Sequence, residues 1–153
     1  MSNICSYTMK AVAEKEETLK RLLDIMNYKD EEFFIDSCNY AHLKNSWEEN
    51  GLIYYEIEGS VDGSCKTWFE TEENKKNKLF GKEAHYVTVD LLCKKLNMGV
   101  ELYANDHDIG FEQWFVCDRN GEFTKDEEDD EVGVEGYGVF MDARDIWEGN
   151  FIH

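Results

Sequence analysis

The 153-residue chain contains no proline, and its 16 lysine and arginine residues stand against 34 aspartate and glutamate residues. The absence of proline excludes a proline-rich linker or recognition tail. The shortage of basic residues leaves a formal net charge of −18. Nucleic acid and anionic membrane surfaces are therefore poor direct partners, because both carry dense negative charge. A basic protein surface is the natural complement, and acidity that only maintains solubility is the alternative explanation.

Long hydrophobic runs are also missing. No apolar stretch reaches membrane-spanning length, and the opening MSNICSYTMKAVAEKEE lacks the basic region and apolar run of a secretory signal. The five cysteines are odd in number and widely spaced, with no C-x-x-C pair, which predicts reduced thiols. Together these absences predict a soluble, cytosolic protein.

What the chain does have is the composition of one folded domain, with 42% hydrophobic and 14% aromatic residues. Alternating or β-branched segments predict strands, with turns at Asp62-Gly63 and Asn120-Gly121, over residues 4–12, 52–61, 64–71, 100–106 and 111–118. Helical spacing of apolar residues predicts helices over residues 14–27 and 84–97, the second ended by Gly99. Residues 31–51 show no clean period, and we expect a connection with a short turn of helix there.

This order of elements predicts an α+β fold of the ferredoxin-like, split βαβ type, with an antiparallel sheet and two helices on one face. We expect a single domain over residues 1–153, whose ferredoxin-like body ends at residue 123. Residues 124–153 are predicted to be an acidic C-terminal extension made of an acidic loop, an edge strand over 132–141 and a short terminal helix.

Two segments carry a family resemblance. The opening SNICSYTMKAVA resembles the start of the YubB-like ferredoxin-like proteins of phages and plasmids, whose first strand begins Asn-x-Cys-Ser. The segment VELYANDHDIGFEQWFVCDRNGEF, residues 100–123, is similar to the second conserved hairpin of that family, whereas KTWFET echoes its central motif only faintly. The family has no established activity, so the resemblance implies a fold and a mobile-element origin, and no catalytic residues.

Two segments contain residues that could bind a metal ion, but neither matches a known metal-binding pattern. The loop NDHD, Asn105 to Asp108, gathers oxygen and imidazole ligands, but consecutive residues point in different directions and a polar turn explains them. An EF-hand frame would have Asp118, Asn120, Gly121 and Glu127 at positions three, five, six and twelve, yet its first position would be a valine. We therefore expect no metal and no cofactor.

Catalytic patterns are equally weak. Cys38 and His42, four residues apart, could share a helix face, but no third group is evident to orient the histidine. Cys117 lies beside an acidic residue, which disfavours a reactive thiolate. No phosphate-binding glycine motif is present. The sequence therefore favours a protein without enzymatic activity, and an enzyme with an unrecognised site is the weaker alternative.

The distribution of charge is the remaining feature. Between Glu122 and Glu148, eleven acidic residues stand against two basic ones, whereas the stretch from Lys66 to Lys95 has seven lysines and five acids. Acidic and aromatic residues of this C-terminal region form the predicted partner-binding set: Asp126, Glu127, Glu128, Asp129, Asp130, Glu131, Glu135, Tyr137, Asp142, Asp145 and Trp147. Carboxylates on a rigid sheet can imitate the phosphates of a duplex, and aromatic residues can anchor an interface.

These observations favour a phage- or mobile-element-encoded inhibitor of the anti-CRISPR or wider anti-defence type. It would act as a DNA or RNA mimic on a basic, nucleic-acid-handling protein of the host, such as a CRISPR effector, without binding nucleic acid itself. The first alternative is an acidic accessory module that binds a protein without mimicry. A solvated, idle acidic loop is the simplest explanation of the run itself. The oligomeric state is left open.

Overall fold

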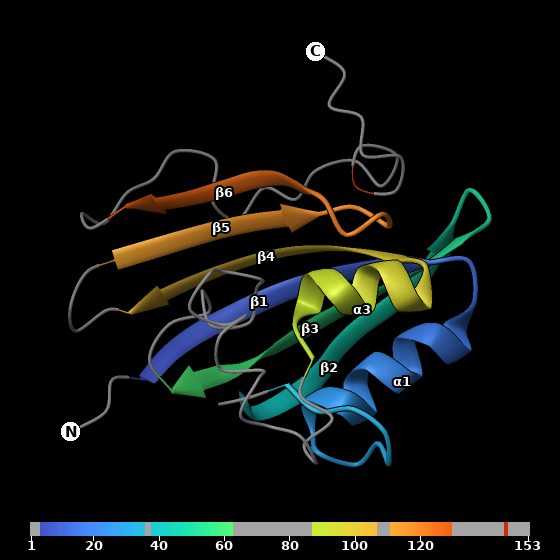
Figure 1. The fold of residues 1–153 in the computed structure, drawn as a ribbon, viewed down its shortest axis with the longest axis horizontal. Helices are drawn as coiled ribbons and strands as arrows, with labels where there is room; N and C mark the ends of the chain where they lie inside the picture. The colour runs from blue at the N-terminus through green and yellow to red at the C-terminus, as the bar shows by residue number, and fades with distance from the viewer. Residues whose placement is uncertain (1–3, 36–37, 63–86, 107–110, 130–145, 147–153) are drawn as a thin grey trace.

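The computed structural model describes residues 4–35, 38–62, 87–106, 111–129 and 146 (Figure 1). The helices are α1 (Glu16–Met26) and α3 (Val89–Leu96). The strands are β1 (Ile4–Ala13), β2 (Cys38–Glu49), β3 (Leu52–Asp62), β4 (Met98–Asp106), β5 (Phe111–Cys117) and β6 (Phe123–Asp129). The predicted α+β class is confirmed.

The strands form one six-stranded sheet in the order β2-β3-β1-β4-β5-β6. Every neighbouring pair is antiparallel, as predicted. Strand β3 lies between β1 and β2, the two strands that α1 connects, and β1 lies between β3 and β4. Both helices lie on the same face of the sheet (Figure 1). The opposite face, called the open face below because neither helix covers it, lies behind the sheet in this view.

The core lies between the sheet and the two helices. One row of buried side chains crosses four strands, because Met9 pairs with both Ile57 and Leu102, and Leu102 pairs with Phe115. Helix α1 buries three of the four apolar residues whose spacing predicts it, Leu19, Leu22 and Met26, together with Ile25, whereas the fourth, Leu23, is partly buried. Each fully buried side chain of this size contributes about 1.5–3 kcal/mol through removal of apolar surface from water.

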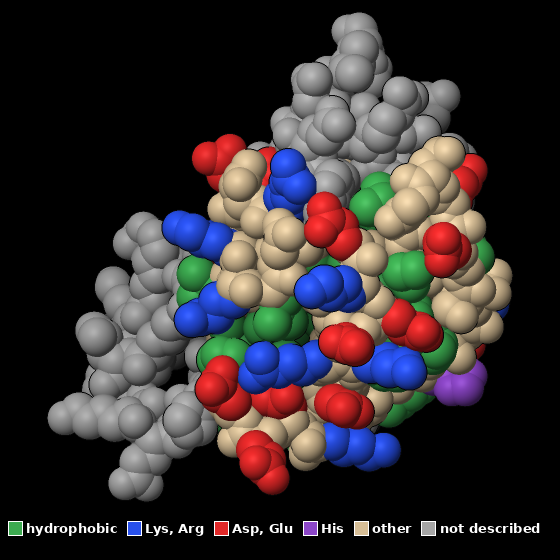
Figure 2. Space-filling view, turned by 90° about the vertical axis from the view of Figure 1, so that its right-hand side faces the viewer, with side chains coloured by type: hydrophobic (Ala, Val, Ile, Leu, Met, Phe, Trp, Pro, Cys, Tyr) green, Lys and Arg blue, Asp and Glu red, His purple; other side chains and the backbone are tan. Residues whose placement is uncertain are grey.

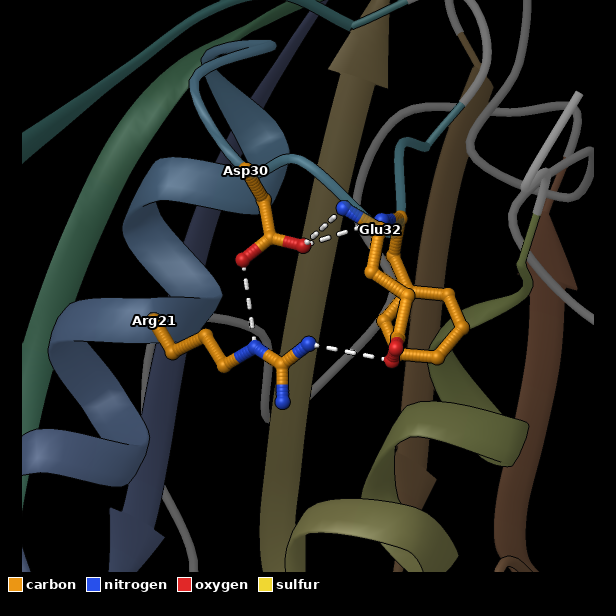
Figure 3. A network of polar contacts seen from close by, with 4 residues as sticks. Arg21, Asp30 and Glu32 are labelled. Carbon is orange, nitrogen blue, oxygen red and sulfur yellow. Dashed lines mark hydrogen bonds and ion pairs between the residues drawn. The ribbon is translucent and has the colours of Figure 1, made fainter.

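The segment between α1 and β2 is held by a polar network (Figure 3). Arg21 of α1 donates hydrogen bonds to Asp30, at 3.1 Å, and to Glu32, at 3.2 Å. Burial alone would raise the pKa of Asp30, but the bonds from Arg21 and from the backbone N–H groups of Phe33 and Glu32 outweigh it and lower that pKa. The Phe33 ring also lies 5.7 Å from the Lys95 ammonium, which links the segment to α3.

Strand β2 corrects the predicted connection over residues 31–51. The strand is twelve residues long, but its pairing with β3 is interrupted between Cys38 and Tyr40 and again between Leu43 and Asn45. Each irregularity shifts the alternation of side chains, which hides the period of two from a sequence pattern. Asn50 and Gly51, both with positive φ, make the turn into β3, as expected for a two-residue hairpin.

Strand β3 does not pair with a strand that follows it directly, as the predicted hairpin at Asp62-Gly63 would require. Both edges of β3 are taken, one by β2 and one by β1. The expected returning strand, residues 64–71, lies outside the described residues, as does the expected edge strand over 132–141.

Gly99 does not end the second helix. The left-handed position belongs to Asn97, with φ of 55°, a residue that tolerates this conformation. Gly99 lies inside β4, where a Cβ atom would collide with Ile146 and come within 3.2 Å of Val12. Ile146 is helical and completely buried, the one described residue of the predicted terminal helix. The neighbours of Val12 in β1 and of Gly99 in β4 face the helices, so Val12 and Gly99 themselves face the other side of the sheet. Ile146 contacts them there, on the face that α1 and α3 do not cover.

This packing predicts a non-additive pair of substitutions. Gly99→Ala should destabilise the protein by about 1–3 kcal/mol through overpacking, and Ile146→Ala by about 2–5 kcal/mol through loss of buried volume. In the Ile146→Ala background, Gly99→Ala should cost clearly less, because its methyl group enters the vacated space. Urea denaturation of the four proteins measures this cycle. Simple addition of the two effects would contradict the contact.

Candidate protein-binding site

The acidic run begins as a strand and not as the predicted loop. Strand β6 takes in Asp126, Glu127, Glu128 and Asp129, and its backbone pairs with β5 so that Glu127 lies opposite Trp114. Aspartate and glutamate are poor strand formers in isolation, so the pairing with β5 overrides local preference. Strand β6 is the last strand in the sheet order. Within the described part of the chain, the run is therefore carried by an edge of the sheet.

The other seven residues of the predicted partner-binding set lie outside the described residues. They are Asp130, Glu131, Glu135, Tyr137, Asp142, Asp145 and Trp147. The structure thus brings four of the eleven predicted residues together on one strand and leaves the arrangement of the rest as a prediction.

A buried aspartate fixes the turn from which β6 starts. Asp118 is 2% exposed, and its Oδ1 accepts hydrogen bonds from the backbone N–H groups of Asn120, at 2.8 Å, and Glu122, at 3.1 Å. Gly121, with φ of +80°, lies so close to the Asp90 carbonyl that a Cβ atom would approach it to 2.9 Å. The turn is therefore anchored both internally and against α3, which sets the direction of β6.

An aromatic residue stands next to the acidic strand. Trp114 of β5 is half-buried, and its indole N–H donates a 2.9 Å hydrogen bond to Glu101 of β4. Glu101 is 1% exposed, so the bond holds the ring in a fixed orientation. Sequence analysis named aromatic anchors further along the chain and missed Trp114. The strand pattern of residues 111–118 contained it, but its position beside the acidic run follows only from the pairing of β5 with β6.

Charge is distributed differently elsewhere on the described surface. Figure 2 shows the face that lies to the right in Figure 1, and there Lys and Arg side chains alternate with Asp and Glu side chains. Such mixing is typical of an ordinary solvated surface. Among the described residues, the longest run of consecutive acidic residues is Asp126 to Asp129 of β6. The shorter run from Asp30 to Glu32 has two of its carboxylates bonded to Arg21. The edge formed by β6 is therefore the candidate docking site for a basic protein.

The candidate nucleophile pair is separated by the sheet. Cys38 and His42 both lie in β2, not on a helix, and the irregularity after Cys38 leaves the thiol buried and the imidazole exposed. Burial raises the pKa of Cys38 to about 11, although hydrogen bonds with Tyr7 and Tyr40 act in the opposite direction. The thiol is thus protonated at neutral pH and cannot act as a nucleophile with His42.

Asp118, at position three of the EF-hand frame, uses its Oδ1 to accept two backbone hydrogen bonds. Asn105 and Asp106 lie at the end of β4, while His107 and Asp108 lie outside the described residues. Among the residues that the structure describes, no three His, Cys, Asp or Glu side chains are placed to share a metal ion. The described cysteines are free and buried: Cys5, Cys38, Cys93 and Cys117.

No helix within the described ranges combines the length and the apolar character needed to cross a membrane. Comparison of the chain with protein-family models, with curated proteins and with solved structures gave no match.

The turn before β6 gives the first test at this site. Asp118→Ala removes the acceptor of two backbone bonds and should lower the free energy of unfolding by about 1–3 kcal/mol. Asp118→Asn keeps an oxygen at the same place and should cost less than Asp118→Ala. Urea denaturation compares the three proteins. Equal losses for the two variants would show that the accepted hydrogen bonds do not hold the turn.

The buried thiol gives the second test. Because the folded-state pKa of Cys38 lies near 11, its alkylation by iodoacetamide in the native protein should be slow at pH 8 and accelerate as the pH approaches 11. The protonated thiol favours the folded state, so this contribution to stability is complete below the thiol's unfolded pKa of 9.0 and is lost as pH rises through 11. Peptide mapping by mass spectrometry follows the modification. Rapid labelling of Cys38 at pH 8 would contradict the assignment.

Proposed function

We propose that the chain is a non-enzymatic inhibitor that binds a basic, nucleic-acid-handling protein of the host through the acidic edge strand β6. The single observation that carries the proposal is the placement of consecutive acidic residues on β6, the last strand of the sheet that the described residues form. A strand rises roughly 3.3 Å per residue, and each strand of duplex DNA carries one charge per about 3.4 Å of axis. Along the strand axis, the residues of β6 therefore follow one another at the spacing of the phosphates in one nucleic-acid strand, with successive side chains directed to opposite faces of the sheet.

A rigid array of this kind suits a groove that normally holds phosphates. Binding recovers much of the counterion-release free energy that nucleic acid would supply, while the pairing with β5 limits the conformational freedom lost on docking. Charge mainly steers association, so an aromatic contact is needed as an anchor. Trp114, which pairs with Glu127, is a further candidate for that role in addition to the predicted Tyr137 and Trp147.

The ferredoxin-like assignment belongs to the same proposal. In the order β2-β3-β1-β4, each helix-connected pair of strands is split by one antiparallel strand, which is the arrangement of a split βαβ fold. Strands β5 and β6 extend this body at one edge. We retain the YubB-like resemblance, the mobile-element origin and the anti-CRISPR type of action as parts of the hypothesis, together with residence in the host cytosol.

A second function is favoured by a specific feature of β6. Within the described residues β6 pairs on one side only, with β5. An exposed strand edge can accept a strand from another protein through backbone hydrogen bonds. In that case the chain is an accessory module that binds without mimicry, and the acidic residues protect the edge from unwanted pairing.

The deciding variant is Asp126→Asn, Glu127→Gln, Glu128→Gln and Asp129→Asn combined. If β6 is a mimic, wild-type protein should capture nucleic-acid-binding proteins from host lysate at low salt, and competing duplex DNA should release them. The quadruple variant should capture far less, although a single carboxylate at a solvent-exposed rim typically contributes only about 1 kcal/mol or less. Affinity should fall steeply with salt, because exposed charges are screened beyond about 8 Å at physiological ionic strength.

A matched control changes charge by the same amount elsewhere. The substitutions Glu14→Gln, Glu17→Gln, Asp24→Asn and Glu31→Gln neutralise four exposed residues on and around α1 and should leave capture intact. Equal loss in both variants would show that only net charge matters. Capture that resists DNA and survives neutralisation of β6 would favour the accessory module.

A further inference from the structure

The open face of the sheet is hollowed at the end where β1 begins. The hollow has a volume of about 290 Å³, close to the lower limit of typical small-ligand pockets, about 300 Å³. Side chains and backbone from four strands line it, among them Ser6, Thr8, Tyr40, Glu58, Tyr103 and Asn105. Ile146 covers the same face near Val12 and Gly99, towards the opposite end of β1.

The register explains why these residues meet. Thr8 of β1 pairs with Glu58 on one side and with Tyr103 on the other. In the next row, Ser6 pairs with Asn105 on one side and with Ser60 on the other, and Ser60 pairs with Tyr40. Directly paired residues point to the same face of a sheet. Two adjacent rows therefore bring hydroxyl, carboxylate, amide and phenol groups together from strands that are far apart in sequence.

The hollow offers hydrogen-bond acceptors to a ligand. The Oδ1 atom of Asn105 is buried and has no hydrogen-bond partner, and a buried acceptor left unpaired carries a desolvation cost that a donor would relieve. Glu58 has Lys44 as an ion-pair partner, but at 3.9 Å and with both side chains about half exposed. That separation is longer than a charge-assisted hydrogen bond of about 2.7–2.9 Å, so the carboxylate can accept further bonds.

The lining selects against anions and favours a flat cation. Among the described residues that line the hollow there is neither lysine nor arginine, and the charged residue among them, Glu58, repels phosphate. Tyr40, 53% exposed, and Tyr103 offer aromatic rings to a cation. A guanidinium group is planar, stacks on aromatic rings and has five N–H donors. These properties suit a hollow whose acceptors, Glu58 and Asn105, lie in neighbouring rows on the two sides of β1. An ammonium group lacks this planar fork.

We propose that this hollow is a binding site for a guanidinium group. The group comes either from a small molecule or from an arginine side chain of a protein partner. The site is separate from β6, and the inference does not rest on the proposed function. Besides Glu58, the nearby charged or titratable groups are Lys44 and His42 of β2 and Lys10 of β1, the last of which lies over the Tyr54 ring at 5.6 Å.

The test uses Nα-acetyl-argininamide and its neutral analogue Nα-acetyl-citrullinamide, titrated into the full chain at 0.15 M NaCl. Amide chemical shifts in NMR spectra report the site. The arginine compound should give saturable shifts around Thr8, Glu58 and Asn105, and the citrulline compound should bind at least about tenfold more weakly, because it lacks the charge. Similar binding by the two compounds would overturn the proposal.

Variants separate the site from general attraction to an acidic protein. Glu58→Gln should weaken binding of the arginine compound by about fivefold or more, and Asn105→Ala should also weaken it without lowering thermal stability, because Oδ1 makes no internal hydrogen bond. Glu56→Gln is the matched control, on the same strand and face but outside the hollow, and should bind like wild type. Equal effects of Glu56→Gln and Glu58→Gln would refute a defined site.

The source of the group is decided by a second comparison. Free agmatine and a capped pentapeptide with a central arginine are titrated into the same protein. Stronger binding of the peptide assigns the site to an arginine of a protein partner, and stronger binding of agmatine assigns it to a small molecule. Absence of saturable binding by either probe would overturn the proposal. The acidic residues of β6 are unchanged in these variants, so failure here leaves the proposed function standing.

Discussion

The pairing of β1 along both of its edges is the constraint on which the rest of the structure depends. Strand β1 is matched to β3 along Ile4–Ala13 and to β4 from Ser6 to Ala13. A shift of one residue in either register would turn Met9 and its helix-facing neighbours towards the open face. The same pairing decides which residues form that open face. The core, the hollow and the contact surface for Ile146 are therefore all consequences of the register of β1.

This constraint also limits where consecutive acidic residues can be placed. In a central strand, every second side chain would face the helices, and a buried charge without a partner is costly. At an edge, water reaches the strand, and charges there also discourage pairing with other molecules. The acidic run begins on β6, the edge next to β5. The position of the acidic run is therefore compatible with a stable fold whether or not the run binds a partner. For this reason, competition with DNA is needed to distinguish protection of the edge from recognition of a basic surface.

Sequence patterns predicted the elements whose local preference agrees with the final fold. Strands β1, β3, β4 and β5 and helix α1 were found within a few residues of their ends, because alternation or helical spacing is continuous there. Strand β2 was missed because two irregularities in its pairing break the alternation, although Asn50-Gly51 marked its turn. Strand β6 was predicted as a loop because its acidic composition disfavours a strand. Its pairing with β5 depends on the tertiary fold, which local sequence patterns do not reveal.

The candidate site was predictable only in part for a related reason. A run of acidic residues is visible in any sequence, so four of the β6 residues were named. The contribution of Trp114 depends on cross-strand register, and that of Asp118 on the backbone of a turn, which local patterns do not reveal. The hollow is still less visible, because Glu58, Thr8 and Tyr103 become neighbours only when non-consecutive strands are ordered as β3-β1-β4.

One row of the register joins the two surfaces. Glu58 pairs with Thr8, Thr8 with Tyr103, Tyr103 with Trp114, and Trp114 with Glu127. Neighbouring strands lie about 4.8 Å apart, so the four steps from β3 to β6 span roughly 19 Å. A protein interface of ordinary size extends over such a distance. A basic partner could therefore insert one arginine into the hollow, contact Trp114 and lie along β6 at the same time. In that geometry the aromatic and acceptor groups of the hollow supply the short-range contacts that hold the complex, while the charges of β6 supply the long-range attraction that forms it.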